Sequence, residues 1–156
     1  MEREIDYAAI APDGIKAMAG LEAYVRHSGL EPSLLELVKT RVSQINRCAY
    51  CIDMHTKDAR ARGESEQRLY ALQAWRETPF YSERERAGLA WAEALTELSS
   101  KEIPGSLQVE MARLYSEKEW VDLTFAIIAI NGWNRLAIPF HKPAGSYQAN
   151  IQHSSQ

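Results

Sequence analysis

The sequence has little of what marks an exported, membrane-spanning or nucleic-acid-binding protein. It holds two cysteines in 156 residues, and 18 Lys and Arg face 21 Asp and Glu, a formal net charge of −3. A chain without a positive surplus lacks the electrostatic footprint that nucleic acids need. The longest apolar run, LTFAIIAI at 123–130, is far too short to span a bilayer. The first residues are charged and lack the apolar core of a secretion signal, so we expect a cytoplasmic protein.

Strand patterns are missing as well. No segment alternates apolar and polar residues with the β-branched character of a strand. Apolar residues recur instead every three or four positions, which predicts helices over 14–27, 32–46, 48–62, 66–76, 83–99, 106–115 and 117–137. Ser65, Ser82 and Ser116 stand where helix N-caps are expected. The length suits one domain over 1–156. We therefore predict an all-α domain of about six to seven helices.

The last predicted helix is apolar on nearly every side. Its large apolar residues are Trp120, Val121, Leu123, Phe125, Ile127, Ile128, Ile130, Trp133 and Leu136. A helix that is hydrophobic all round lies in the core or contacts another subunit, and we expect part of this one to form an oligomer interface. Asn131, Asn134 and Arg135 interrupt it. These polar groups need partners, either within the core or around a functional site.

The two cysteines lie close together in the stretch NRCAYCIDMHTKDAR at 46–60. On a helix of about 100° per residue, Cys48, Cys51 and His55 project within an arc of about 60°. Asp53 and Lys57 fall on the opposite face, which we expect to be solvated, and Tyr50 points the same way. The reactive side chains thus share the inward face.

Three interpretations of this face are open. In the first, the cysteines form a dithiol that cycles to a disulfide. Cys51 and His55 are at i and i+4, where helix side chains meet. Cys48 lies in the first turn, where the helix dipole favours a thiolate. A lone cysteine pair in a reducing compartment is more often catalytic or metal-binding than a permanent crosslink.

In the second interpretation, Cys48, Cys51 and His55 bind zinc. Structural zinc needs four ligands, and the chain has no further cysteine. The remaining histidines are isolated and lack ligand spacing, which is typical of surface or loop positions: His27, His141 and His153. In the third, the cysteines are small buried hydrophobes beside a satisfied histidine. The ligand count and the shared face favour the dithiol.

Glu36, eleven further residues, then Cys48-x-x-Cys51-x-x-x-His55 together resemble the motif of the alkylhydroperoxidase D (AhpD)-like family, within the carboxymuconolactone decarboxylase superfamily. The stretch 45–96 and the segment AIIAINGWNRLAI at 126–138 also resemble its small members, so the resemblance covers most of 30–140. It implies an all-helical fold assembling as trimers or hexamers, and a thiol-dependent hydroperoxide reductase for antioxidant defence. We expect no cofactor, no metal and no membrane or nucleic-acid partner.

The resemblance also implies a role for each residue of the motif. Cys51 would attack the peroxide and become a sulfenic acid, and Cys48 would resolve it as a disulfide. Glu36 and His55 would form the proton relay. An external dithiol, a lipoyl group or a thioredoxin-like protein, would reduce the disulfide. The best-known members carry a histidine just before the second cysteine, where this chain has Tyr50, a departure that bears on the relay, the substrate and the reductant.

Two arguments from the residues themselves disagree with the roles that the resemblance implies. On its own helix Glu36 lies off the apolar stripe, so spacing alone predicts a solvated glutamate. The helix dipole alone favours Cys48 as the more acidic thiol, while the contact with His55 favours Cys51.

Two other functions remain open. One is a decarboxylase or lactone-processing enzyme like the superfamily's namesakes, which need no cysteine pair. The other is a redox-sensing protein whose assembly responds to oxidation.

Overall fold

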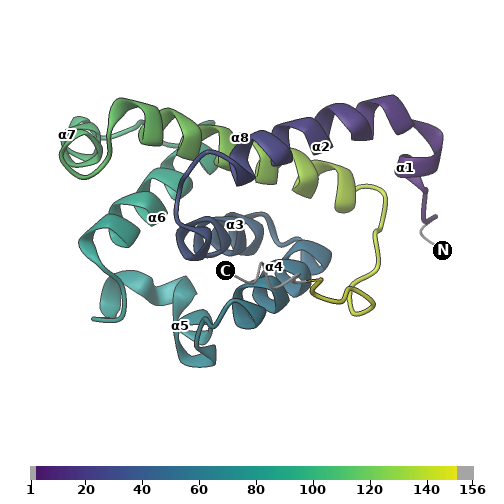
Figure 1. The fold of residues 1–156 in the computed structure, drawn as a ribbon, viewed down its shortest axis with the longest axis horizontal. Helices are drawn as coiled ribbons and strands as arrows, with labels where there is room; N and C mark the ends of the chain where they lie inside the picture. Colours follow the sequence, from purple (N-terminus) through teal and green to yellow (C-terminus); the bar gives the residue numbers. More distant parts are fainter. Residues whose placement is uncertain (1–2, 151–156) are drawn as a thin grey trace.

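The computed structural model describes residues 3–150, which form a bundle of helices (Figure 1). In chain order these are α1 Tyr7–Ile10, α2 Pro12–Arg26, α3 Pro32–Asn46, α4 Ala49–Ala61, α5 Glu66–Tyr70, the 3₁₀ helix η1 Leu72–Glu77, α6 Glu83–Thr96, α7 Gly105–Leu114 and α8 Glu117–Ala137. Within the described residues there is no strand, which confirms the predicted all-α fold.

Helix α3 lies at the centre of the bundle. It packs against α4, α6 and α8, while α2 runs along α8 (Figure 1). One side of α3 enters the buried cluster that holds Cys48 and Cys51, and Leu37 enters a second cluster with Trp75 and Leu89. Because neighbours surround α3, polar positions such as Glu36 are buried along with the apolar ones.

Local signals set most helix ends. The hydroxyls of Ser65, Ser82 and Ser116 accept backbone N–H groups at the starts of α5, α6 and α8, which confirms all three as N-caps. The ranges predicted for α3 and α8 agree with the structure. The prediction missed α1, a single turn whose start is capped by Asp6.

The predicted helix over 66–76 is wrong as one continuous element. The chain forms α5, then passes at Ala71 into η1, with non-helical dihedrals at Ala74. Leu69, Leu72 and Trp75 are all buried and spaced three apart. A 3₁₀ helix repeats every three residues, so in η1 Leu72 and Trp75 share the face that packs into the core.

Polar residues in α8 are paired inside the core. Asn46 Nδ2 donates to Asn131 Oδ1 and to Asn134 Oδ1, each at 2.9 Å, and Asn134 Nδ2 donates to Ser43 Oγ at 3.2 Å. Arg135 donates to the carbonyl and side chain of Asn131. Asn131 and Asn134 therefore tie α8 to α3, as the core interpretation predicts, whereas Arg135 is exposed and bonds to Asn131 of its own helix.

The outer face of α8 carries exposed apolar side chains. Val121, Phe125 and Ile128 are 39–54% exposed. The predicted oligomer interface would lie here, and it stays a prediction. No helix within residues 3–150 combines the length and apolarity needed to cross a membrane.

Candidate functional site: a disulfide beside a Glu–His pair

The site lies where α3 ends and α4 begins. Arg47 ends α3 with a left-handed backbone, φ 59°. The backbone N–H groups of Arg47 and Cys48 donate hydrogen bonds to the carbonyls of Gln44 and Ser43, respectively. This sharp turn makes Cys48 the N-cap of α4, one position before the helix rather than within its first turn. Its Sγ accepts the N–H of Cys51 at 3.3 Å, and the two cysteines form a disulfide.

The expectation of a solvated Glu36, based on its own helix, is wrong. Its side chain is buried, and Oε2 lies 2.9 Å from Nδ1 of His55. A glutamate is seldom buried without a partner, and His55 on the neighbouring helix supplies one. The packing of α4 on α3 thus brings together the Glu36 and His55 that the motif pairs.

Electrostatics fix the proton on this pair. Burial alone would raise the pKa of Glu36, but the hydrogen bond with His55 and the positive charges of His55, Lys39 and Arg62 outweigh it and hold the pKa below the ordinary 4.5. The carboxylate is therefore ionised at neutral pH and can only accept, so Nδ1 of His55 carries a hydrogen. The other ring nitrogen, Nε2, is the one that is not bonded to Glu36. Helical side chains lean toward the helix N-terminus, so this ring leans toward the turn that carries Cys51.

Asp58 and Tyr147 extend this pair, and the sequence analysis did not single them out. Asp58 lies three residues after His55, on the same helix face. The ligand-type atoms of Glu36, His55 and Asp58 lie within 4.8 Å of one another. Tyr147 donates its hydroxyl hydrogen to Asp58 Oδ1 at 2.8 Å. Burial, and after it the charge of Glu36, raises the pKa of Asp58 against the opposing effect of the Tyr147 hydrogen bond.

Glu36, His55 and Asp58 form the candidate metal-binding cluster among residues 3–150. Glu36 bonds to His55, and Asp58 accepts from Tyr147, so we interpret the set as two neighbouring hydrogen-bonded pairs. The zinc interpretation of Cys48, Cys51 and His55 gains no further ligand within this described part of the chain.

The sequence predicted a solvated face of α4 at Asp53 and Lys57. In the structure this face also contacts another segment of the chain. Lys57 Nζ donates to the carbonyl of Tyr147 and to Asp53 Oδ2, each at 2.9 Å. Asp53 Oδ2 also accepts the N–H of Gly145 at 3.0 Å. These bonds hold the segment 143–150 along α4, as the yellow trace in Figure 1 shows. That segment brings Tyr147 to Asp58.

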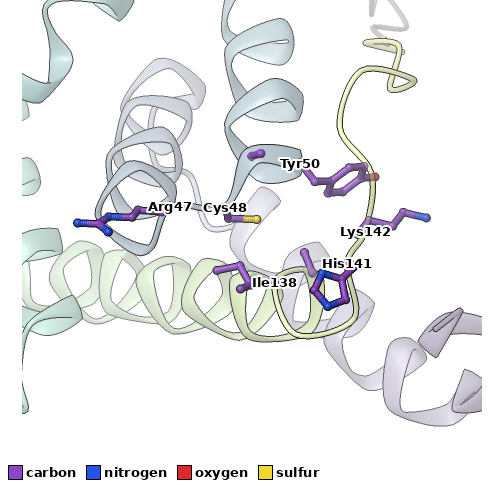
Figure 2. A pocket seen from close by; sticks show the side chains of 8 residues that line it. Arg47, Cys48, Tyr50, Ile138, His141 and Lys142 are labelled. Carbon is purple, nitrogen blue, oxygen red and sulfur yellow. The ribbon is translucent and has the colours of Figure 1, made fainter. Parts of the chain in front are cut away.

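A cavity of about 300 Å³ lies beside Cys48. The Cys48 sulfur points into it, and Tyr50, Ile138, His141 and Lys142 surround it, whereas the Arg47 side chain points away (Figure 2). Tyr50 lies at this cavity, with the Lys142 ammonium 5.6 Å from its ring centre. Tyr50, the point where the motif departs from the one it resembles, thus lines the approach to Cys48.

The remaining histidines are placed as follows. His27 is exposed at the end of α2, and its Nδ1 bonds to the Ala23 carbonyl. His141 is exposed in the turn after α8, as expected of a loop residue, yet it lines the same cavity as Cys48. No signal in the sequence placed it there. His153 is outside the described residues.

Comparison with known proteins gives consistent results. The model of the carboxymuconolactone decarboxylase family matches residues 12–94. The uncharacterized protein YdfG of Bacillus subtilis is 45% identical over 146 residues, covering 94% of this chain and 99% of its own. The crystal structure of an Agrobacterium tumefaciens protein of unknown function, suggested to be an AhpD for antioxidant defence, is 41% identical with a TM-score of 0.89, covering 93% of this chain and 99% of that one.

The family's fold serves other chemistry too. The debrominase Bmp8 superposes with a TM-score of 0.79 at 22% identity, covering 88% of this chain and 74% of its own, and shares the fold. The family model spans more than half of this chain, and the AhpD-like structure matches nearly all of it. The chain therefore belongs to the carboxymuconolactone decarboxylase family, among its AhpD-like members.

Proposed function

We propose that this protein is a thiol-dependent hydroperoxide reductase that cycles Cys48 and Cys51 between dithiol and disulfide. One observation carries the proposal: an ionised Glu36 holds His55, and His55 lies one helical turn after a buried cysteine pair. A nucleophilic cysteine needs a base beside it and a group that orients that base, and this arrangement supplies both.

The oxidising half-reaction uses Cys51 and the pair behind it. His55 Nε2 takes the proton of the Cys51 thiol, and the thiolate attacks the outer oxygen of the hydroperoxide. The O–O bond breaks, and the alkoxide leaves with the proton held by His55. The products are an alcohol and a sulfenic acid on Cys51. Glu36 orients the imidazole and stabilises it while it carries the extra proton.

Cys48 then closes the disulfide. Its sulfur attacks Cys51 Sγ and the S–O bond breaks, and the departing hydroxide takes the proton of the Cys48 thiol and leaves as water. The position of Cys48 suits this role, because a helix N-terminus stabilises a thiolate and the Cys51 N–H already points at its sulfur. An external dithiol, a lipoyl group or a thioredoxin-like protein, returns both cysteines to thiols. A cytoplasmic location and assembly through the outer face of α8 belong to the same proposal.

Turnover by cysteine variants tests the function. We expect the wild type to reduce cumene hydroperoxide at the expense of a dithiol, and Cys48→Ser and Cys51→Ser each to lose that turnover. Met54→Leu, on the same helix and at an oxidisable residue, should retain it and serves as the control. Undiminished turnover in both cysteine variants would contradict the proposal.

Two further outcomes would redirect it. Lactone processing or decarboxylation that survives the double Cys→Ser change would favour the cysteine-independent chemistry of the family's namesakes. A disulfide-dependent change in assembly without turnover would favour a redox sensor.

A further inference from the structure

We propose that His141 is a catalytic acid–base group for reduction of the disulfide, acting across the cavity from Cys48. The inference rests on the proposed dithiol cycle and assigns a residue to its reducing half.

Access decides which sulfur a reductant meets. Cys48 and Cys51 are only 1% and 3% exposed, so neither is open to bulk solvent. Cys48 lines the cavity, and Cys51 is not among the residues that do. At about 300 Å³ the cavity is as large as the smaller ligand pockets, enough for a small dithiol. An entering thiol therefore reaches Cys48 first.

Backbone strain singles out the same cavity. Among residues 3–150, the non-glycine residues with left-handed backbone are Arg47 at φ 59° and His141 at φ 54°, and both line it. The N–H groups of His141 and Lys142 donate to the carbonyls of Ile138 and Ala137. This pairing ends helices in a left-handed residue that is usually glycine, because a side chain there is strained. Strained non-glycine residues gather at functional sites.

The strained turn also aims the side chain. Figure 2 shows the His141 imidazole and the Cys48 sulfur pointing into the same cavity from two different elements. At Arg47, by contrast, the strained backbone serves the turn that starts α4, and its side chain points away (Figure 2).

Among the described residues that line the cavity, His141 contributes the imidazole, the side-chain type that proteins use most often for acid–base catalysis. The other charged or titratable groups that line it are Arg47, Cys48, Tyr50 and Lys142, and none is a carboxylate. Arginine, lysine and tyrosine ordinarily titrate well above neutral pH, whereas imidazole titrates between pH 5 and 8. A proton leaving an incoming thiol therefore has His141 as its acceptor.

The step balances with a dithiol as reductant. His141 takes the proton of the first thiol, whose sulfur bonds to Cys48 Sγ. The Cys48–Cys51 bond breaks, and its electron pair goes to Cys51, which takes a proton that His55 Nε2 relays from solvent. The second thiol then loses its proton to solvent, bonds to the first sulfur and expels the Cys48 thiolate. Cys48 takes the proton held by His141. The reductant leaves as its own disulfide.

The test isolates this half-reaction. Protein oxidised with diamide is mixed with dithiothreitol, quenched by alkylation and counted for free thiols by mass spectrometry. His141→Asn keeps a residue that tolerates the left-handed turn but removes the base. We expect reduction about tenfold to thirtyfold slower at pH 7, where a thiol of pKa about 8.5 is only about 3% thiolate. The two rates should converge near pH 9, where the thiol ionises unaided.

Two further variants separate chemistry from structure. His141→Gly places the residue that the turn prefers and should also be slow, although its fold is no less stable. His27→Asn removes an exposed histidine at another helix end and should reduce at the wild-type rate. Equal rates for wild type and His141→Asn at pH 7, or a deficit that persists at pH 9, would overturn the proposal.

Because diamide replaces the hydroperoxide, this result is independent of the peroxidase proposal. A protein that fails to consume peroxide but shows the His141 effect would refute the proposed function alone. A protein that turns over peroxide but reduces equally fast without His141 would refute this inference alone.

Discussion

Replacing Glu36 by glutamine removes one charge and almost no volume from the centre of the site. The carboxylate is buried and 2.9 Å from His55 Nδ1. The amide oxygen of glutamine can still accept the Nδ1 hydrogen, so the ring keeps its orientation. It cannot compensate the charge of the imidazolium that the proposed mechanism forms when His55 takes the Cys51 proton. The variant therefore separates electrostatics from geometry.

The magnitudes follow from these two contributions. A hydrogen bond to a charged group stabilises by about 1.5–3 kcal/mol and a neutral one by about 0.5–1.5 kcal/mol, so the free energy of unfolding should fall by about 1 kcal/mol. Catalysis should suffer more, because positioned acid–base groups contribute about 100-fold to 10,000-fold. We expect Glu36→Gln to lower kcat/KM for hydroperoxide at least about 100-fold, about 2.7 kcal/mol of transition-state stabilisation.

The stability difference should also depend on pH. The folded pKa of Glu36 lies below its ordinary 4.5, so the extra stability is present above 4.5 and is lost as the pH falls through the lowered value. Urea unfolding of wild type and variant should differ at pH 7 and converge as the pH drops below 4.5.

Glu93→Gln is the matched control. Glu93 is also a buried glutamate, held by Trp75, Arg41 and Arg76, but outside the cysteine site. Its replacement should cost stability and leave turnover intact. The reasoning is refuted if Glu36→Gln keeps wild-type kcat/KM, or if Glu93→Gln loses as much.

Three further predictions concern stability. Because the disulfide closes a loop of only four residues, the double variant Cys48→Ser, Cys51→Ser should stay folded and lose at most about 2 kcal/mol in urea unfolding. A loss above about 4 kcal/mol would show a structural staple instead. Tyr147→Phe removes the hydrogen bond to Asp58 and should cost about 1 kcal/mol, with faster amide exchange at Gly145; unchanged exchange would show that the hydroxyl does not hold the segment. Gly88→Ala would place a methyl group 2.8 Å from the Tyr115 hydroxyl and 3.2 Å from Leu34 Cδ1, so the free energy of unfolding should fall by about 1–3 kcal/mol. A neutral result would show that α6, which carries Gly88, can move away from these two side chains.

Features encoded over a few residues could be predicted from the sequence. The serine caps of α6 and α8, and Pro32 at the start of α3, act on the backbone beside them, so these helix starts are where the sequence puts them. The shared face of Cys51 and His55 likewise follows from helical spacing alone.

Contacts between distant segments could not be predicted this way. A helical wheel of α3 finds one apolar stripe, but α3 is surrounded by α4, α6 and α8, so Glu36 and Lys39 are buried too. Only the spacing shared with a known family pointed to Glu36. Tyr147 lies 89 residues from Asp58, and no local pattern links them.

His141 illustrates the same limit. Its position depends on how the turn after α8 meets the start of α4, which is a property of the assembled bundle. A lone histidine between Phe140 and Lys142 gives no sign of either the strained turn or the cavity.

The most direct test of the central claim is to trap a sulfenic acid. Cys48→Ser protein is treated with one equivalent of cumene hydroperoxide in the presence of dimedone and analysed by mass spectrometry. The dithiol mechanism predicts one dimedone adduct per chain, on Cys51, formed far more slowly when Glu36 is also replaced by glutamine. An unmodified Cys51, with an adduct found only on Cys48 in the Cys51→Ser protein, would contradict the assignment of the nucleophile and of the relay behind it.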